Sequence, residues 1–321
     1  MRISVIVTVK NEAQNIHRLL DSLAVQTRAP DEIIVCDGGS TDGTLATLRA
    51  EARLPLKIIV RPDTNISQGR NAAITEATGK IIASTDAGVV LAPEWLNELA
   101  TPFDKGDSGE LGGIRGVAGF FLPDPQTAFE VAMGATVLPQ LAEIRPETFL
   151  PSSRSVAFRK EAWQAVGGYP EWLDYCEDLI FDLALRKRFG PFAFASKAIA
   201  YFRPRGSLRA FFRQYYQYAR GDGKADLFRR RHAVRYLTYL VVVPAIALAG
   251  ALLSPWWWAL YLVGAAAYTC TPYRRLATLW GRSSAADKLQ AALLVPVIRV
   301  TGDIAKMIGY PVGVTWRLNK R

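Results

Sequence analysis

The chain has 321 residues, of which 50% are hydrophobic, and it carries a formal net charge of +10. Its three cysteines are widely spaced and it contains two histidines, so the composition indicates neither a disulfide framework nor a zinc site. The length accommodates one large α/β domain of about 200 to 250 residues with an appendage.

The basic charge is concentrated in one segment. Residues 186–235 hold fourteen Lys or Arg against two acids, Asp222 and Asp226, and an apolar segment follows directly. A basic belt beside an apolar segment favours an anionic membrane surface, where each basic residue contributes about 1 kcal/mol. No nucleic-acid recognition motif is visible, so we do not expect nucleic acid as a partner.

The first 84 residues alternate between strand and helix patterns. Helical spacing covers 13–26, 44–52 and 69–78. Buried or β-branched runs of strand length cover Ile3 to Val9, Ile33 to Cys36, Leu56 to Val60 and Lys80 to Ser84. The alternation predicts a parallel sheet with helices on both faces, in which ligands bind beyond the carboxyl ends of the strands.

The last third of the chain is apolar. Two apolar runs, Leu237 to Leu253 and Trp256 to Cys270, have basic residues outside both ends, and three tryptophans stand at the turn where the second run begins. This follows the positive-inside and aromatic-belt pattern, which predicts a helical hairpin with both ends in the cytosol. Each run is at or below the usual length of a spanning helix, so buried core helices are the alternative.

We therefore expect two domains. The first, residues 1–235, is catalytic and includes an interfacial basic helix over 208–235. The second, residues 236–321, is a membrane anchor. It combines the hairpin over 237–270 with an interfacial helix over 287–310 that is broken near Pro296.

Acidic residues stand where predicted strands end. Asp37 closes the second strand before two glycines, where a carboxylate can accept hydrogen bonds from a base or a ribose. Asp86 follows the fourth strand, where an acid can hold a cation that bridges a diphosphate. Capping of a helix or turn is the alternative for both residues.

Two further pairs carry potential chemistry. Glu177 and Asp178 precede a helical run, and a helix N-terminus helps to keep a general base ionised at neutral pH. Gln217 and Arg220 share one face of the basic helix, where an arginine fork can neutralise a leaving diphosphate. The alternatives are stabilisation of the helix end for the acids and a solvated interfacial side chain for the arginine.

Five sequence elements occur in a fixed order: VTVKNE (7–12), PDEIIVCDGGSTDGT (30–44), SQGRNAAI (67–74), STDAGVVLAPEWL (84–96) and VGGYPEWLDYCEDLIFDLALR (166–186). Taken in this order, they resemble the family 2 glycosyltransferases of the GT-A fold over about residues 1–235. A sixth element, Gln217-Tyr-Ala-Arg220, is similar to the QxxRW motif of membrane-integrated processive members.

The resemblance implies an α/β, Rossmann-like nucleotide-sugar-binding domain with a C-terminal transmembrane or interfacial helical region. It also implies roles for single residues. Thr8, Glu12, Asp37 and Arg70 would line the nucleotide pocket, Asp86 would contact the donor ribose or a metal, Asp178 would be the catalytic base with Glu177 beside it, and Gln217 and Arg220 would hold the diphosphate.

Two positions depart from the family pattern. The DxD-type motif reads Asp86-Ala87-Gly88, so the second acid is missing and the need for Mg²⁺ or Mn²⁺ is in question. Gly221 stands where QxxRW has the tryptophan that would stack on an acceptor sugar, which argues against a processive polymerase.

The expected function is inverting transfer of a sugar from a nucleoside diphosphate donor to a lipid-linked glycan or glycolipid. The expected location is the inner or plasma membrane, with membrane lipids as partners and a cytoplasmic catalytic domain. A polyprenyl-phosphate glycosyltransferase is the closest alternative. A catalytically inactive nucleotide-sugar-binding assembly protein is the alternative from another class.

Overall fold

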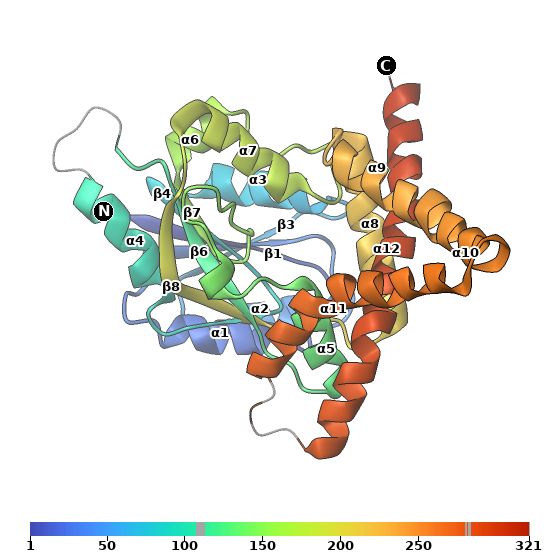
Figure 1. Cartoon of the computed structure of the whole chain (residues 1–321). Helices are drawn as coiled ribbons and strands as arrows, with labels where there is room; N and C mark the ends of the chain where they lie inside the picture. The colour runs from blue at the N-terminus through green and yellow to red at the C-terminus, as the bar shows by residue number, and fades with distance from the viewer. Residues whose placement is uncertain (107–112, 280, 282–283, 321) are drawn as a thin grey trace. The chain divides into compact units, whose positions relative to one another are not determined.

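The computed structural model describes residues 1–106, 113–279, 281 and 284–320 (Figure 1). The chain forms two compact units, of which the first comprises Met1–Asp124 and Leu141–Arg203. The second comprises Pro125–Gln140 and Pro204–Arg321, and it therefore takes in the basic helix that the sequence grouped with the catalytic residues. That grouping rests on function rather than packing, and it stays a prediction.

The first unit is built on an eight-stranded sheet in the order β3-β2-β1-β4-β7-β6-β8-β5. Strands β3, β2, β1 and β4 are parallel, as predicted, whereas β7 is antiparallel to both β4 and β6. The second half of the sheet, about which the strand pattern made no prediction, is mixed, because β6 pairs in parallel with β8 and β8 is antiparallel to β5. The strands are β1 (Ile3–Val9), β2 (Glu32–Asp37), β3 (Leu56–Val60), β4 (Ile81–Asp86), β5 (Val89–Leu91), β6 (Gly116–Pro123), β7 (Val156–Arg159) and β8 (Ala193–Phe202).

Helices cover both faces of this sheet, which confirms that prediction (Figure 1). Alternate side chains of β1 point to opposite faces, so Val5 and Val7 enter one core and Ile6 the other. The first core is covered by α1 (Ile16–Ala24), α2 (Thr44–Ala50) and α4 (Trp95–Gly106), and the second by α3 (Ile66–Glu76), α6 (Lys160–Ala165) and α7 (Glu177–Phe189). Each fully buried large apolar side chain contributes about 1.5 to 3 kcal/mol.

The second unit is helical, with a core shared by α5, α8, α11 and α12. Helix α12 runs unbroken past Pro296, so the predicted break is wrong. The proline costs a hydrogen bond, but Val295 and Ile298 on either side are fully buried in this core and hold the helix in place. The helices are α5 (Ala128–Val137), α8 (Leu208–Ala225), α9 (Arg229–Leu237), α10 (Val243–Leu252), α11 (Ala259–Leu279) and α12 (Ala285–Asn319).

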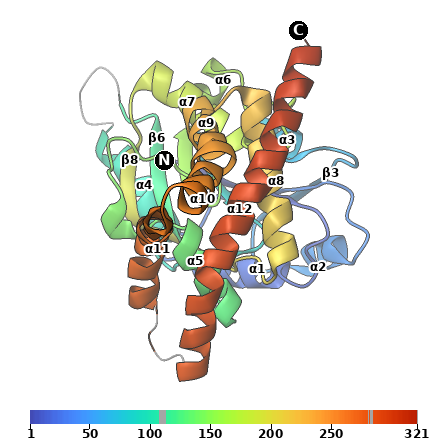
Figure 2. The same ribbon diagram turned by 45° about the vertical axis from the view of Figure 1, so that its right-hand side comes forward.

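Helices α8 and α12 lie side by side in backbone contact (Figure 2). A Cβ atom at Gly309 would overlap the carbonyl of Tyr216, and one at Gly313 would overlap the carbonyl of Arg220. These two glycines of α12 therefore allow an approach that no larger residue permits at this spacing.

The second unit also exposes many large apolar side chains. Among the described residues, the continuous helical segment Arg229–Leu252 is the one helix long and apolar enough to cross a membrane, and 6% of its most apolar window is buried. Such low burial contradicts the alternative of buried core helices for this segment. The second arm of the predicted hairpin, α11, does not meet the same test, so the hairpin topology stays a prediction.

Candidate active site

The carboxyl ends of β1, β2 and β4 bring three predicted site residues to one edge of the sheet. Val9 pairs with Asp37 across β1 and β2, and Thr8 pairs with Asp86 across β1 and β4. Because the three strands are parallel neighbours, Thr8, Asp37 and Asp86 lie at the edge where such sheets bind ligands.

Asp37 is fully buried and is oriented by the turn that follows it. Its Oδ1 accepts hydrogen bonds from the backbone N–H groups of Gly39 (2.8 Å) and Ser40 (2.7 Å). Its Oδ2 is buried and has no hydrogen-bond partner among the described residues. Helix α2 is capped by Gly43, so helix capping does not explain Asp37. A buried acceptor without a partner is costly, and an N–H or O–H of a nucleotide would satisfy it.

Thr8 and Glu12 shape the loops around this edge. The N–H of Glu12 donates to Thr44 Oγ1 at 2.8 Å, which ties the loop after β1 to the start of α2. A Cβ atom at Gly69 would lie 3.0 Å from Thr8 Cγ2, so the first turn of α3 packs directly against the end of β1. Both residues are placed for a nucleotide pocket, and that role stays a prediction.

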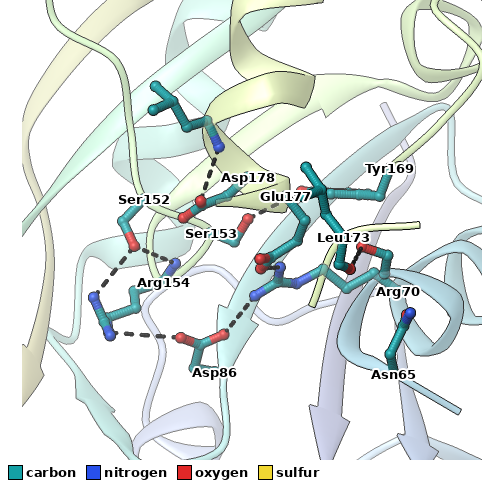
Figure 3. Close-up of polar contacts among 12 residues, drawn as sticks. Asn65, Arg70, Asp86, Ser152, Ser153, Arg154, Tyr169, Leu173, Glu177 and Asp178 are labelled. Atoms are coloured by element: carbon teal, nitrogen blue, oxygen red, sulfur yellow. Dashed lines mark hydrogen bonds and ion pairs between the residues drawn. The ribbon is translucent and has the colours of Figure 1, made fainter. Parts of the chain in front are cut away.

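Arg70 of α3 is enclosed between two acids (Figure 3). Its guanidinium donates to Glu177 Oε1 at 2.6 Å and to Asp86 Oδ1 at 3.0 Å. The guanidinium carbon also lies 5.3 Å from the ring centroid of Tyr169. With 2% of its surface exposed, Arg70 is a buried cation that fixes Asp86 and Glu177 in position. Its predicted place in the nucleotide pocket stays untested.

A capping box sets the direction of α3 and so of Arg70. The side chain of Asn65 accepts from the N–H of Gln68 at 2.9 Å, and the side chain of Gln68 accepts from the N–H of Asn65 at 2.9 Å. The amide of Asn65 also donates to the carbonyl of Glu171 at 2.7 Å. The start of α3 is thereby fixed to the segment that leads into Glu177 and Asp178.

The neighbouring acids Glu177 and Asp178 occupy different environments. Glu177 is buried against Arg70, and burial together with the charge of Asp178 raises its pKa to about 7 despite that arginine. Asp178 is partly exposed in the first turn of α7, and its Oδ1 accepts from the N–H of Leu179 at 2.8 Å. Asp178 is therefore the more accessible carboxylate of the pair.

Asp182 belongs to the same cluster and was missed from the sequence. It lies one helical turn after Asp178 and is 2% exposed. Burial, followed by the charge of Asp178, raises its pKa well above the usual range of an aspartate. The spacing of four residues was the available signal, because residues i and i+4 share one face of a helix.

Arg154 was also missed. Its Nε lies 3.5 Å from Asp86 Oδ2, and its guanidinium carbon lies 4.6 Å from the ring centroid of Phe202. Both oxygens of Asp86 thus face guanidinium groups, one from Arg70 and one from Arg154. Arg154 comes from a loop without periodicity, so no sequence pattern indicated it.

Gln217 and Arg220 lie on α8 in the second unit. The Oε1 atom of Gln217 is buried and has no hydrogen-bond partner among the described residues. The carbonyl of Arg220 is the atom that faces Gly313 of α12. Both residues are one turn apart on this helix, as predicted, and their contact with a diphosphate stays a prediction.

The chain alone does not assemble a cation site around Asp86. Among residues 1–106, 113–279, 281 and 284–320, no three His, Cys, Asp or Glu side chains gather in a way that could hold a metal ion. Asp86 supplies one carboxylate, and Gly88 supplies no side-chain ligand. This donor set suits Mg²⁺, which commonly combines one or two carboxylates with substrate phosphate oxygens and water.

Comparisons of the chain with known proteins point to one family. The sequence model of glycosyl transferase family 2 matches residues 4–164, half of the chain. The succinoglycan biosynthesis protein ExoA of Rhizobium meliloti is 27% identical over 278 residues, which cover 84% of this chain and 83% of that protein. An uncharacterized glycosyltransferase of Nostoc sp. is 32% identical over 110 residues, which cover 33% of this chain and 34% of that protein.

The fold has counterparts among solved structures. The mannosyltransferase PcManGT of Pyrobaculum calidifontis, solved in complex with GDP-Man and Mn²⁺, matches with a TM-score of 0.61 at 23% identity. The match covers 92% of this chain and 87% of PcManGT. It carries the fold, which is that of the GT-A glycosyltransferases, whereas the family follows from the sequence match over half of the chain. The chain is a glycosyltransferase and belongs to glycosyltransferase family 2.

Proposed function

We propose that this glycosyltransferase moves a sugar from a nucleoside diphosphate donor to an acceptor hydroxyl with inversion, and that Asp178 is the base. The observation that supports this most is the split between Glu177 and Asp178. Glu177 is buried and paired with Arg70, whereas Asp178 is partly exposed at the start of α7. A base must reach the proton that it removes, and Asp178 alone of the two acids meets that condition.

The step conserves charge and atoms. The acceptor oxygen attacks the anomeric carbon from the face opposite the diphosphate, and its proton passes to Asp178 Oδ. The bond between the anomeric carbon and the diphosphate oxygen breaks, and the diphosphate leaves with the electron pair. The configuration at the anomeric carbon therefore inverts. General base catalysis of this kind contributes about 10²- to 10⁴-fold in rate.

The departing diphosphate needs positive charge, and the first unit offers little near Asp86 that is not already paired. Both guanidinium groups near Asp86 are already engaged by acids. A divalent ion bound with the donor would supply compensating charge there, and PcManGT, with its Mn²⁺, supports this reading. Gln217 and Arg220 are the further candidates, as the QxxR resemblance implies.

The acceptor is proposed to be membrane-associated. Exposed apolar side chains such as Leu248 (59%), Leu252 (78%) and Trp256 (84%) favour lipid rather than water as their surroundings. The basic residues before this segment favour the cytoplasmic side of an inner or plasma membrane for the first unit. The similarity to ExoA, a succinoglycan biosynthesis protein, supports a role in polysaccharide synthesis, and together with the apolar segment it favours a lipid-linked glycan or glycolipid as the acceptor.

A product analysis tests the reaction. The detergent-solubilised chain is first screened against nucleotide sugars by thermal shift, because a ligand at 100 times its Kd stabilises a protein by about 2.7 kcal/mol. The selected donor is then incubated with a membrane lipid extract, and NMR gives the anomeric configuration of the product. Inverted configuration is expected. Retained configuration would reject the mechanism, and an absence of transfer with any stabilising donor would favour the inactive assembly protein.

Membrane association has its own test. The chain should pellet with membranes in 1 M NaCl and enter solution in detergent. The double variant Leu248→Glu and Leu252→Glu should weaken that association, because carboxylates inside a membrane are costly. Val25→Glu, an exposed apolar position of the first unit, is the matched control and should change nothing. Release of the unaltered chain by salt alone would contradict an apolar anchor.

A further inference from the structure

The side chains of α12 form three lengthwise stripes. Gly302, Gly309 and Gly313 belong to the buried stripe, which packs within the second unit. An exposed apolar stripe recurs every three or four residues and comprises Leu289, Leu293, Val297, Val300, Ile304 and Ile308. Between the two stripes lie Arg299, Asp303 and Lys306, whose spacing of four and three residues puts them on one flank.

Asp303 is fully engaged by donors from other helices. Its Oδ1 accepts from Arg235 Nε of α9 at 2.7 Å. Its Oδ2 accepts from the hydroxyl of Tyr268 of α11 at 2.6 Å and from that of Tyr239 at 3.3 Å. The carboxylate charge is thus compensated by one arginine and two hydroxyls.

Arg299 and Lys306, on either side of Asp303, have no such compensation. Neither forms an ion pair with a carboxylate among the described residues. The guanidinium carbon of Arg299 lies 4.4 Å from the ring centroid of Tyr268, and its Nε is buried without a hydrogen-bond partner among the described residues. The amine of Lys306 lies 4.9 Å from the ring centroid of Tyr215. Aromatic faces stabilise these cations weakly and leave most of their donors unused.

The surroundings of Lys306 also disfavour its charge. Burial, followed by the charges of Arg235 and Arg299, lowers its pKa to about 8, although Asp303 and Asp222 act in the opposite sense. Asp222 itself contacts His232 of α9 at 3.1 Å. Arg299 and Lys306 flank a carboxylate that three other donors already engage, so a bound anion would stabilise both cations.

The place of these cations indicates the kind of anion. Arg235 lies near the start of the apolar segment Arg229–Leu252, and the flank of Arg299 and Lys306 adjoins the exposed apolar stripe of α12. Figure 2 shows α12 along its length, with α9 and α8 beside it. An anion bound here has an apolar surface next to it, which suits a molecule that joins a phosphate to a hydrocarbon chain.

We propose that Arg299 and Lys306, assisted by Arg235, bind the phosphate monoester or diphosphate of a lipid. Cations outnumber carboxylates in this cluster even with Asp222 counted, and a phosphate monoester, with two negative charges, gains more from that excess than a phosphodiester with one. This inference rests on the proposed function for the view that the lipid is the acceptor. Binding of the lipid phosphate requires only the second unit, so it is tested independently of the proposed function.

Binding is measured in dodecyl maltoside, a detergent without phosphate, on the full chain and in the absence of any sugar donor. The probes are geranylgeranyl phosphate, geranylgeraniol and inorganic phosphate, titrated by isothermal calorimetry. The lipid phosphate should bind at least about tenfold more tightly than either other probe. Equal affinity for the alcohol would overturn the phosphate site, and equal affinity for inorganic phosphate would overturn the lipid as its source.

Variants then locate the site. Arg299→Gln and Lys306→Met should each weaken binding of geranylgeranyl phosphate about tenfold, and Lys306→Arg should restore most of it. Lys288→Met, which removes a cation from the same helix without contacts to this cluster, is the control and should bind normally. Equal losses for Lys288→Met and Lys306→Met would overturn the assignment.

Two controls separate folding and catalysis from this site. Thermal unfolding and binding of the selected nucleotide sugar should be unchanged in each variant. The three probes also give a result on the unaltered chain if a variant does not fold. Lipid phosphate binding without sugar transfer would leave this inference standing and would count against the proposed function instead.

Discussion

The first and second units both bury charged side chains, but the first has an excess of carboxylates and the second an excess of cations. In the first unit Asp86, Glu177, Asp178 and Asp182 surround Arg70, with Arg154 near Asp86. In the second unit Arg235, Arg299 and Lys306 surround Asp303, which three donors already engage. Excess carboxylate suits proton removal and a transition state with positive charge on the sugar, and excess cation suits a phosphate. Under the two proposals, the first unit removes a proton and the second binds a lipid phosphate.

Removing the proposed base should have the largest effect. Asp178→Asn keeps the size of the side chain but cannot take a proton, so kcat should fall by about 10³-fold or more. Donor affinity, measured by thermal shift, should be unchanged because Asp37 and its turn are untouched. Turnover close to that of the unaltered enzyme would remove the first unit's acids from the chemistry.

Removing the buried cation of the first unit should cost stability. Arg70→Met leaves Glu177 and Asp86 without their guanidinium partner, so the free energy of unfolding should drop by about 3 kcal/mol. Urea unfolding followed by tryptophan fluorescence measures this. The control is Arg53→Met, which breaks exposed pairs with Asp21 and Glu51 and should cost under about 1 kcal/mol. Equal costs would show that burial of the Arg70 network contributes nothing.

Glu177 should make stability depend on pH. Its pKa rises from 4.5 to about 7 on folding, so the folded chain holds more protons between those values and loses stability as pH rises through them. In Glu177→Gln this loss should disappear, and the variant should gain about 3 kcal/mol relative to the unaltered chain between pH 4.5 and pH 7.5. Urea unfolding at both pH values tests it, since groups of the second unit titrate alike in both proteins. Parallel pH profiles would contradict the raised pKa.

Adding an acid to the first unit should have the smallest effect, and it increases the excess of carboxylate in that unit. Space around Gly88 is open, so Gly88→Asp is accommodated and should tighten Mn²⁺ binding about tenfold in the absence of donor. Electron paramagnetic resonance of free Mn²⁺ measures it. The unaltered enzyme should bind metal weakly without donor and lose activity in excess EDTA. Full activity in EDTA, with divalent metal shown to be absent, would instead favour arginine as the source of positive charge.

The sequence predicted best where the chain repeats a local pattern. Strand β1 begins and ends as predicted, because a continuous apolar run marks a buried strand of a parallel sheet. Edge strand β3 also begins and ends as predicted, although Lys57 interrupts its apolar run. The edge that gathers Thr8, Asp37 and Asp86 follows from strand direction alone. The helix that carries Glu177 and Asp178 was likewise evident from its apolar spacing and its charged first turn.

Long-range polar contacts lay beyond such patterns. Arg70 and Glu177 are 107 residues apart, and nothing local in either segment indicates that they pair. The resemblance placed Arg70 in the nucleotide pocket, whereas its guanidinium is engaged by two acids. Likewise, Arg299 and Lys306 look like solvated charges on an interfacial helix until the donors around Asp303 are known.

The close contacts of Gly309 and Gly313 with α8 fix the position of α12 along that helix. Sliding one helix along the other by a turn, about 5.4 Å, would bring side chains against backbone where Gly309 and Gly313 now sit. Two glycines, which have no functional group, therefore fix where Arg220 lies along α12 relative to the exposed apolar stripe. If that stripe lies in lipid, the absence of a side chain at Gly309 and at Gly313 determines how far from the bilayer Arg220 is held.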